Sequence, residues 1–176
     1  YFIASTFAAM GDSIEHVVSY WILFEKFQSP TLGGVAVLTH WLPFLLLSVY
    51  AGSLADRHDL RRLIQVSQGL MMLVSFGWAV TLLTGTLTEW GAVLLLCLHG
   101  LFGVMAVPAG QLVVHEMVPP DTLQSAVRMN SSARQLGILF GPAIGGTLML
   151  VLSPETTLLL NMLCYVPIVG WAARTR

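Results

Sequence analysis

Three ionisable side chains lie together in an otherwise apolar stretch near the start of the chain. Asp12, Glu15 and His16 are three and four residues apart, which places them on one face of a helix. Asp12 lies near the middle of the predicted segment, where a charge costs roughly 2.5–3.5 kcal/mol on membrane-insertion scales. Such a group is expected to face the bundle interior and exchange a proton, and the alternative is a structural polar cluster bonded to neighbouring helices.

A second group of ionisable residues is a dense charged segment between two apolar runs. Six ionisable side chains lie among the seven residues 56–62, within the stretch Gly52-Ser53-Leu54-Ala55-Asp56-Arg57-His58-Asp59-Leu60-Arg61-Arg62. A short turn between two membrane-spanning helices lies in headgroups and water, so charge collects there. Asp56 follows the predicted end of a helix, where the dipole disfavours an anion, and needs a cationic partner. The simpler interpretation is a topology anchor.

A third pattern is the glycine-rich run 137–146, which reads G-x-x-x-G-P-x-x-G-G. A spacing of four between glycines leaves one helix face bare, so that a neighbouring backbone can approach closely. Proline within such a helix removes a backbone hydrogen bond and bends it. Ordinary close helix packing is the alternative interpretation. The residues of the pattern are Gly137, Gly141, Pro142, Gly145 and Gly146.

These patterns resemble signatures of the major facilitator superfamily of secondary transporters. Gly52, Leu54, Ala55, Asp56, Arg57 and Arg61 match its loop 2–3 motif, with departures at Asp59 and Leu60, and Arg62 stands one residue after the usual second basic position. The glycine-rich run resembles the helix 5 motif of exporters, especially drug–proton antiporters. Together with Gly11-Asp12, Val107-Pro108-Ala109 and Val118-Pro119, the layout resembles the branch of enterobactin exporters and macrolide efflux pumps.

The resemblance implies roles for particular residues. Asp56 would latch this half of a transporter to the other half in one conformation, and the helix 5 motif would seal the path and set the export direction. Proton-coupled relatives often carry R-x-x-x-G in helix 4, where this chain has His99 and Gly103. A protonated histidine would partly replace that arginine, and a packed core residue is the alternative. His40 is expected to be a core residue.

Composition places the chain among α-helical membrane proteins. It has 176 residues, of which 56% are hydrophobic and 10% charged, with a mean hydropathy of +0.78, whereas soluble domains carry about 25% charged residues. The net charge of −1 gives no sign of nucleic-acid binding. Cys97 and Cys164 lie in apolar runs and are expected to be buried hydrophobic residues. Motifs for catalysis, nucleotide binding or metal binding are absent, so no enzyme activity, cofactor or metal is expected.

Six apolar segments are long enough to span a bilayer, which needs about 20 residues each. Seven of the eight basic residues fall on one side of a six-helix arrangement, and Lys26 falls on the other. The positive-inside rule therefore predicts that both termini are cytoplasmic, in the inner or plasma membrane. The segments are 1–24, 32–55, 63–83, 90–114, 123–152 and 156–173.

The predicted fold is an all-α, six-helix transmembrane bundle, half of a twelve-helix transporter. Residues 1–88 and 89–176 would form two inverted three-helix repeats. Trp41, Phe44, Phe102 and Met105 are candidates for an apolar substrate path, but core or lipid-facing packing is the favoured interpretation. The expected function is export of small amphipathic molecules, such as drugs or siderophores, by proton antiport with alternating access. Expected partners are lipid, protons, substrate and a second six-helix half from the same chain, another chain or a homodimer. A non-transporting scaffold or partner subunit is the alternative.

Overall fold

Short polar residues begin most of the helices, as capping chemistry requires. The Ser29, Thr88 and Ser153 hydroxyls accept hydrogen bonds from backbone N–H groups three residues ahead, and Pro30 and Pro154 occupy first helical positions. Asp59 accepts from the backbone N–H groups of both Arg61 and Arg62. These residues fix where the helices start.

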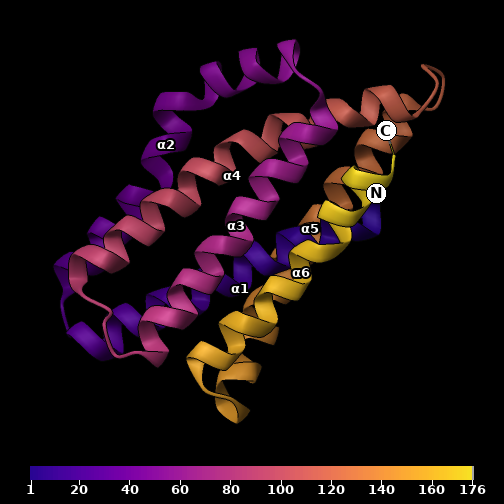
Figure 1. Cartoon of the computed structure of the whole chain (residues 1–176). Helices are drawn as coiled ribbons and strands as arrows, with labels where there is room; N and C mark the ends of the chain where they lie inside the picture. Colours follow the sequence, from indigo (N-terminus) through magenta and orange to yellow (C-terminus); the bar gives the residue numbers. More distant parts are fainter. Residues whose placement is uncertain (176) are drawn as a thin grey trace.

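The computed structural model describes residues 1–175 as six helices joined by short turns (Figure 1). No strand occurs in this range, in agreement with the all-α prediction. The helices extend a few residues further than the apolar runs, so that only His58 and Asp59 of the charged segment lie between helices. The elements are α1 (Phe2–Phe27), α2 (Pro30–Arg57), α3 (Leu60–Leu83), α4 (Glu89–Met117), α5 (Leu123–Val151) and α6 (Pro154–Arg174).

The helices pack in a pattern with internal symmetry. The largest interfaces pair α1 with α5, α3 with α6 and α2 with α4, followed by α3 with α4 and α1 with α6. Exchanging the first three helices with the last three, in order, converts the α1–α5 pair into α4–α2 and returns α3–α6 to itself. The same exchange converts α1–α6 into α4–α3, so all five of these interfaces are preserved.

Two apolar clusters fill the interior at opposite ends of the bundle. Trp78 and Leu158 are fully buried in one of them, and Tyr165 and Val113 in the other. The outer surface is also apolar: Leu45, Val49 and Leu150, among others, expose more than three quarters of their surface. An apolar exterior around a packed interior is the arrangement that a bilayer requires of spanning helices.

Five of the six helices, α2 to α6, are long and apolar enough to cross a membrane. α1 is long enough, with 26 residues, but it is not among the five, and it carries Asp12, Glu15, Glu25 and Lys26. The structure therefore supports a membrane protein with several spans, and a sixth span requires that α1 also crosses the membrane. Two of the acidic residues of α1, Asp12 and Glu15, form part of the candidate site.

Candidate functional site

A histidine from α4 joins two carboxylates from α1. His99 Nε2 lies 2.7 Å from Asp12 Oδ1, and His99 Nδ1 lies 2.8 Å from Glu15 Oε1. The side chains of His99 and Glu15 are each only 2% exposed, whereas that of Asp12 is 37% exposed. The sequence placed Asp12 and Glu15 on one helix face, and the structure brings His99 between them.

Glu15 is held from its other side by a second pair of helices. Ser75 of α3 donates a hydrogen bond to Glu15 Oε2, and Asn161 of α6 donates from Nδ2 to Ser75 Oγ over 3.3 Å. Ser75 and Asn161 are almost completely buried. A continuous polar network therefore links α1, α3, α4 and α6 inside an otherwise apolar interior.

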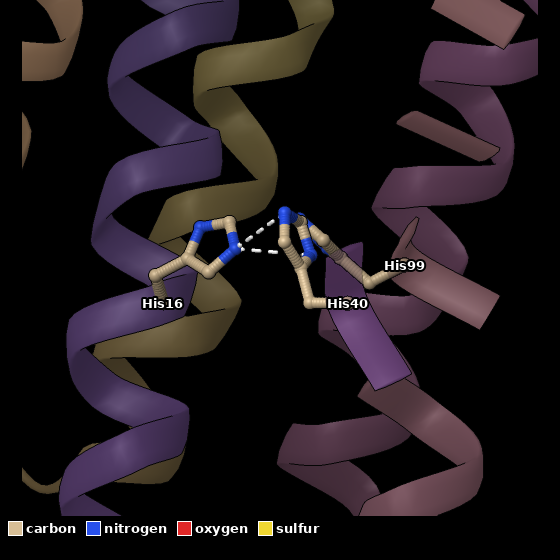
Figure 2. A group of neighbouring side chains, drawn as sticks. All are labelled: His16, His40 and His99. Carbon is tan, nitrogen blue, oxygen red and sulfur yellow. Dashed lines mark hydrogen bonds between the residues drawn. The ribbon is translucent and has the colours of Figure 1, made fainter. Parts of the chain in front are cut away.

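Two more histidines lie beside this network (Figure 2). His16 Nε2 lies 3.1 Å and 3.2 Å from the two ring nitrogens of His40, which comes from α2. The ring centroids of His16 and His99 are 5.0 Å apart, and those of His40 and His99 are 5.5 Å apart. One nitrogen from each ring lies within 4.8 Å of the others, a spacing that can hold a metal ion.

The network carries opposite charges without any lysine or arginine partner among residues 1–175. The ion pairs of Asp12 involve His16 and His99, and the ion pair of Glu15 involves His99. Burying two carboxylates is costly unless nearby cations and hydrogen bonds compensate them. The charge state of the imidazoles therefore controls the charge of the whole cluster, which is a suitable arrangement for exchanging protons or binding a cation.

A cavity of about 250 Å³ opens next to the cluster, and Asp12 and His40 form part of its wall. Trp41, Phe44 and Ile138 provide apolar wall, and Gln68 and Arg134 provide polar wall. Trp41 and Phe44 thus line the cavity. The other two candidates, Phe102 and Met105, are not among its lining residues, and Phe102 packs against the core as the alternative predicted.

Several members of the site could not be recognised from the sequence. His40 was expected to be an ordinary core residue, and it is buried at 5% exposure, but its ring faces His16. Ser75 and Asn161 gave no signal beyond being polar residues in apolar helices. Their roles depend on how α2, α3 and α6 pack around α1.

The charged segment joins two helix ends. Asp56 and Arg57 lie in the last turn of α2, and Arg61 and Arg62 lie in the first turn of α3. Arg61 Nη1 forms an ion pair of 2.8 Å with Glu116 of α4. Asp56 is exposed, and none of the basic residues in the described part of the chain lies within ion-pair distance of it. Gly52 lies one turn earlier, and nothing lies within 4 Å of the position that a Cβ atom would take there.

Asp59, one of the departures from the family pattern, caps α3. The hydrogen bond from the backbone N–H of Arg62, together with that of Arg61, lowers the pKa of the Asp59 carboxyl below its usual value. This carboxyl lies outside the membrane-spanning segments and is fully exposed. Its function in the fold is therefore local: it fixes the turn between α2 and α3.

The helix 5 glycines lie against α1. A Cβ atom on Gly137 would overlap the carbonyl oxygen of Thr6, and one on Gly141 would lie 2.9 Å from the carbonyl oxygen of Met10. Gly145 is closely packed on Ile14. Gly146 meets nothing within 4 Å and Pro142 is exposed, so these two face away from α1. The bare face predicted from the spacing is therefore the surface on which α1 packs.

Comparison with protein families gives a match over the whole chain. The sequence profile of the family described as transmembrane secretion effector matches residues 1–176.

Individual relatives are membrane transporters. The staphyloferrin A transporter of Staphylococcus aureus is 26% identical over 167 residues, which cover 94% of this chain and 42% of the relative. The MFS-type transporter YfiS of Bacillus subtilis is 27% identical over 162 residues, covering 90% of this chain and 37% of the relative. The putative multidrug resistance protein MdtD of Escherichia coli is 30% identical over 135 residues, covering 77% of this chain and 28% of the relative. The chain thus spans roughly a quarter to two fifths of these relatives.

Proposed function

The chain belongs to the transmembrane secretion effector family of the major facilitator superfamily, and on that premise we propose that it forms one half of a secondary transporter that exports small amphipathic molecules by proton antiport. The observation that carries this proposal is the Asp12–His99–Glu15 network beside the cavity. Asp12 is reachable from the cavity and Glu15 is buried. A proton taken up at Asp12 therefore changes the charge of a network to which four helices contribute.

The proposed coupling is electrostatic. With Asp12 ionised, its carboxylate attracts the imidazole of His99 and ties α1 to α4. Protonation of Asp12 weakens that attraction, which frees α4 to move relative to α1. His16 contributes to the same balance, because its Nδ1 lies 3.9 Å from Asp12 Oδ2. A proton can thus bias an alternating-access movement of this six-helix half against the second half. The symmetric packing pattern supports the division of this half into two sets of three helices, residues 1–88 and 89–176.

The cavity wall supports an amphipathic substrate. Trp41 and Phe44 offer flat apolar surface for a ring or an acyl chain, and Arg134 and Asp12 offer charges of both signs. The names of two relatives, a staphyloferrin A transporter and a putative multidrug resistance protein, are compatible with siderophore-like or drug-like cargo. They also favour transport over a non-transporting scaffold.

A complete pathway needs a second half, because the chain covers well under half the length of its relatives. We propose that another six-helix unit, from the same chain, a second chain or a second copy, closes the cavity. Asp56 is exposed at the end of α2, which supports a latch to that unit, and the Gly141 face of α5 supports a tight seal with α1. The arginine distribution supports an inner or plasma membrane location with cytoplasmic termini.

The test is efflux by the transporter that contains this half, in everted membrane vesicles with an imposed proton gradient. We expect an amphipathic fluorescent dye to accumulate in the vesicles, and dye addition to dissipate part of the gradient. A protonophore should abolish uphill movement but spare downhill exchange. Uphill transport that is insensitive to the protonophore would exclude proton antiport, and absence of any dye movement would exclude this class of substrate.

A further inference from the structure

We propose that His16, His40 and His99 form a binding site for a divalent transition-metal ion of the Zn²⁺ class. The three rings come from α1, α2 and α4 and lie close to one another (Figure 2), and that of His40 also lines the cavity. The inference goes beyond the proposed transport function and does not depend on it, since metal binding can be measured on a protein that moves no protons.

The hydrogen bonds of two of the rings leave the correct nitrogen available to a metal. His16 Nδ1 lies 2.7 Å from the carbonyl oxygen of Asp12, so it must carry the hydrogen, and in the neutral ring Nε2 keeps its lone pair. His99 Nδ1 likewise donates to Glu15 Oε1 at 2.8 Å, which leaves Nε2 as the ligand atom. A metal ion binding there would replace the proton that His99 Nε2 shares with Asp12 Oδ1. A carboxylate or carbonyl behind each histidine is the usual support of metal-binding imidazoles.

The spacing of the nitrogens is close to that of a tetrahedral site. Zinc–nitrogen bonds of about 2.0–2.1 Å place two ligand nitrogens roughly 3.3–3.4 Å apart. His16 Nε2 is 3.1 Å and 3.2 Å from the two His40 nitrogens. The ligand nitrogens of all three rings lie within 4.8 Å of one another, so ring rotation has to close the longest separation by no more than roughly 1.4 Å.

The charge of the cluster fits a divalent cation. Asp12 Oδ1 lies 2.7 Å from His99 Nε2, which places an oxygen where a fourth ligand is needed. Three neutral imidazoles, the carboxylates of Asp12 and Glu15 and one divalent ion sum to zero charge. A neutral cluster avoids the cost of leaving a net charge in an apolar interior. Nitrogen ligands select zinc-like ions over Mg²⁺ and Ca²⁺, which prefer oxygen.

The bound ion would join three helices. Asp12 and His40 line the cavity, so an ion can reach the site from it. Once bound, the ion would tie α2 to α1 and α4 through coordinate bonds, in place of the contact between His16 and His40. We therefore expect Zn²⁺ to hold one arrangement of these helices and to raise the thermal unfolding temperature.

The experiment is a Co²⁺ titration of the full transporter, purified without a polyhistidine tag, because tetrahedral Co²⁺ gives strong visible absorption bands. We expect these bands at one ion per chain, and their displacement by Zn²⁺ but not by Mg²⁺. His16→Gln and His40→Gln should each weaken binding by about tenfold or more. His115→Gln is the matched control, since His115 is exposed on α4, bonds only to the carbonyl oxygen of Gln111, and should bind as the unaltered protein does.

X-ray absorption of the zinc-loaded, unaltered protein gives a second measurement that does not depend on the folding of variants. Three imidazole ligands support the site, and two or fewer overturn it. Equal affinity in the His40→Gln and His115→Gln variants would also overturn it, by locating the metal on the surface. If zinc binds through three imidazoles but proton-driven transport fails, the proton-antiport proposal is contradicted and the metal site is supported.

Discussion

At the scale of single residues, the function depends on how Asp12 differs from Glu15. The two acids share His99, yet only Asp12 has a side chain reachable from the cavity, at 37% exposure against 2%. Ser75 fixes Glu15 from behind, whereas Asp12 has no equivalent donor from α3 or α6. We therefore propose that Asp12 is the group that exchanges a proton and that Glu15 orients His99.

Asp12→Asn should separate coupling from binding. The amide is neutral at all pH values, so the network can no longer take up a proton at this position. We expect proton-driven efflux to fall by at least about tenfold, as losses of a positioned proton carrier do, while downhill dye exchange continues. The measurement is uphill and downhill flux in vesicles at matched protein abundance. Uphill, pH-dependent transport by a well-expressed variant would rule out Asp12 as the coupling site.

Asp59 allows a test of the α2–α3 turn that leaves the candidate site unchanged. Asp59→Ala removes the acceptor for the Arg61 and Arg62 backbone N–H groups, so thermal stability should fall. Asp59→Asn keeps an acceptor and should lose less. Because the folded-state pKa is lowered, the charge-dependent part of this stabilisation is present above about pH 3.9 and is lost as pH falls through the lower folded-state pKa. Thermal melts of the three proteins across this pH range measure it, and identical melts for Asp59→Ala and the unaltered protein would contradict the cap.

At the scale of elements, the sequence was most informative about the helices and least about how they meet. Apolar run length located all six helices to within a few residues, and the glycine spacing of α5 identified a close-packing face. The partner of that face, α1, could not be predicted, because a spacing of four shows only that a backbone can approach. The same holds for His99, His40 and Ser75, which come together only through the packing of α1 with α2, α3 and α4.

Gly141→Leu tests the contact between α5 and α1. A Cβ atom at Gly141 would already overlap Ser13, so a leucine must push the two helices apart, and overpacking of this kind costs typically 1–3 kcal/mol. We expect lost or leaky transport and a lower thermal unfolding temperature. Gly170→Leu on α6 is the control, because nothing lies within 4 Å of the Cβ position there. Equal melting temperatures for the two variants would mean that the α1–α5 contact tolerates separation.

At the scale of the whole molecule, the site joins both sets of three helices. α1, α2 and α3 supply Asp12, Glu15, His16, His40 and Ser75, and α4 and α6 supply His99 and Asn161. His99 and Asn161 bond to residues of the first set, so the polar network crosses the boundary between the two sets. A change in protonation at Asp12 therefore acts on a contact between the sets.

The membrane orientation is the remaining prediction at this scale. Arg57, Arg61, Arg62, Arg128, Arg134 and Arg174 favour one side of the membrane, together with Arg176, which lies outside the described residues. Only α1 lacks the composition of an ordinary span, so whether α1 crosses decides on which side of the membrane the N-terminus lies. If α1 crosses the membrane, both termini are cytoplasmic and the turns at Gln28, Gly85 and Pro154 face outside.

Single cysteines placed at Gln28, Gly85, Pro154 and His58 test this orientation in a background without Cys97 and Cys164. The first three should react with a membrane-impermeant maleimide in intact cells, and the fourth only after permeabilisation. A cysteine at Ser19 is the control for α1, because Ser19 is fully buried and should stay unlabelled in both conditions. Labelling of a cysteine at His58 from outside would contradict the predicted orientation.

The number of spans needs a second measurement, because a five-span protein would also place Gln28, Gly85 and Pro154 on one side. A tag is placed before Tyr1 for this purpose. If the tag is protected in intact cells, α1 crosses the membrane and the protein has six spans. If the tag is exposed on the same side as a labelled Gln28, α1 does not cross.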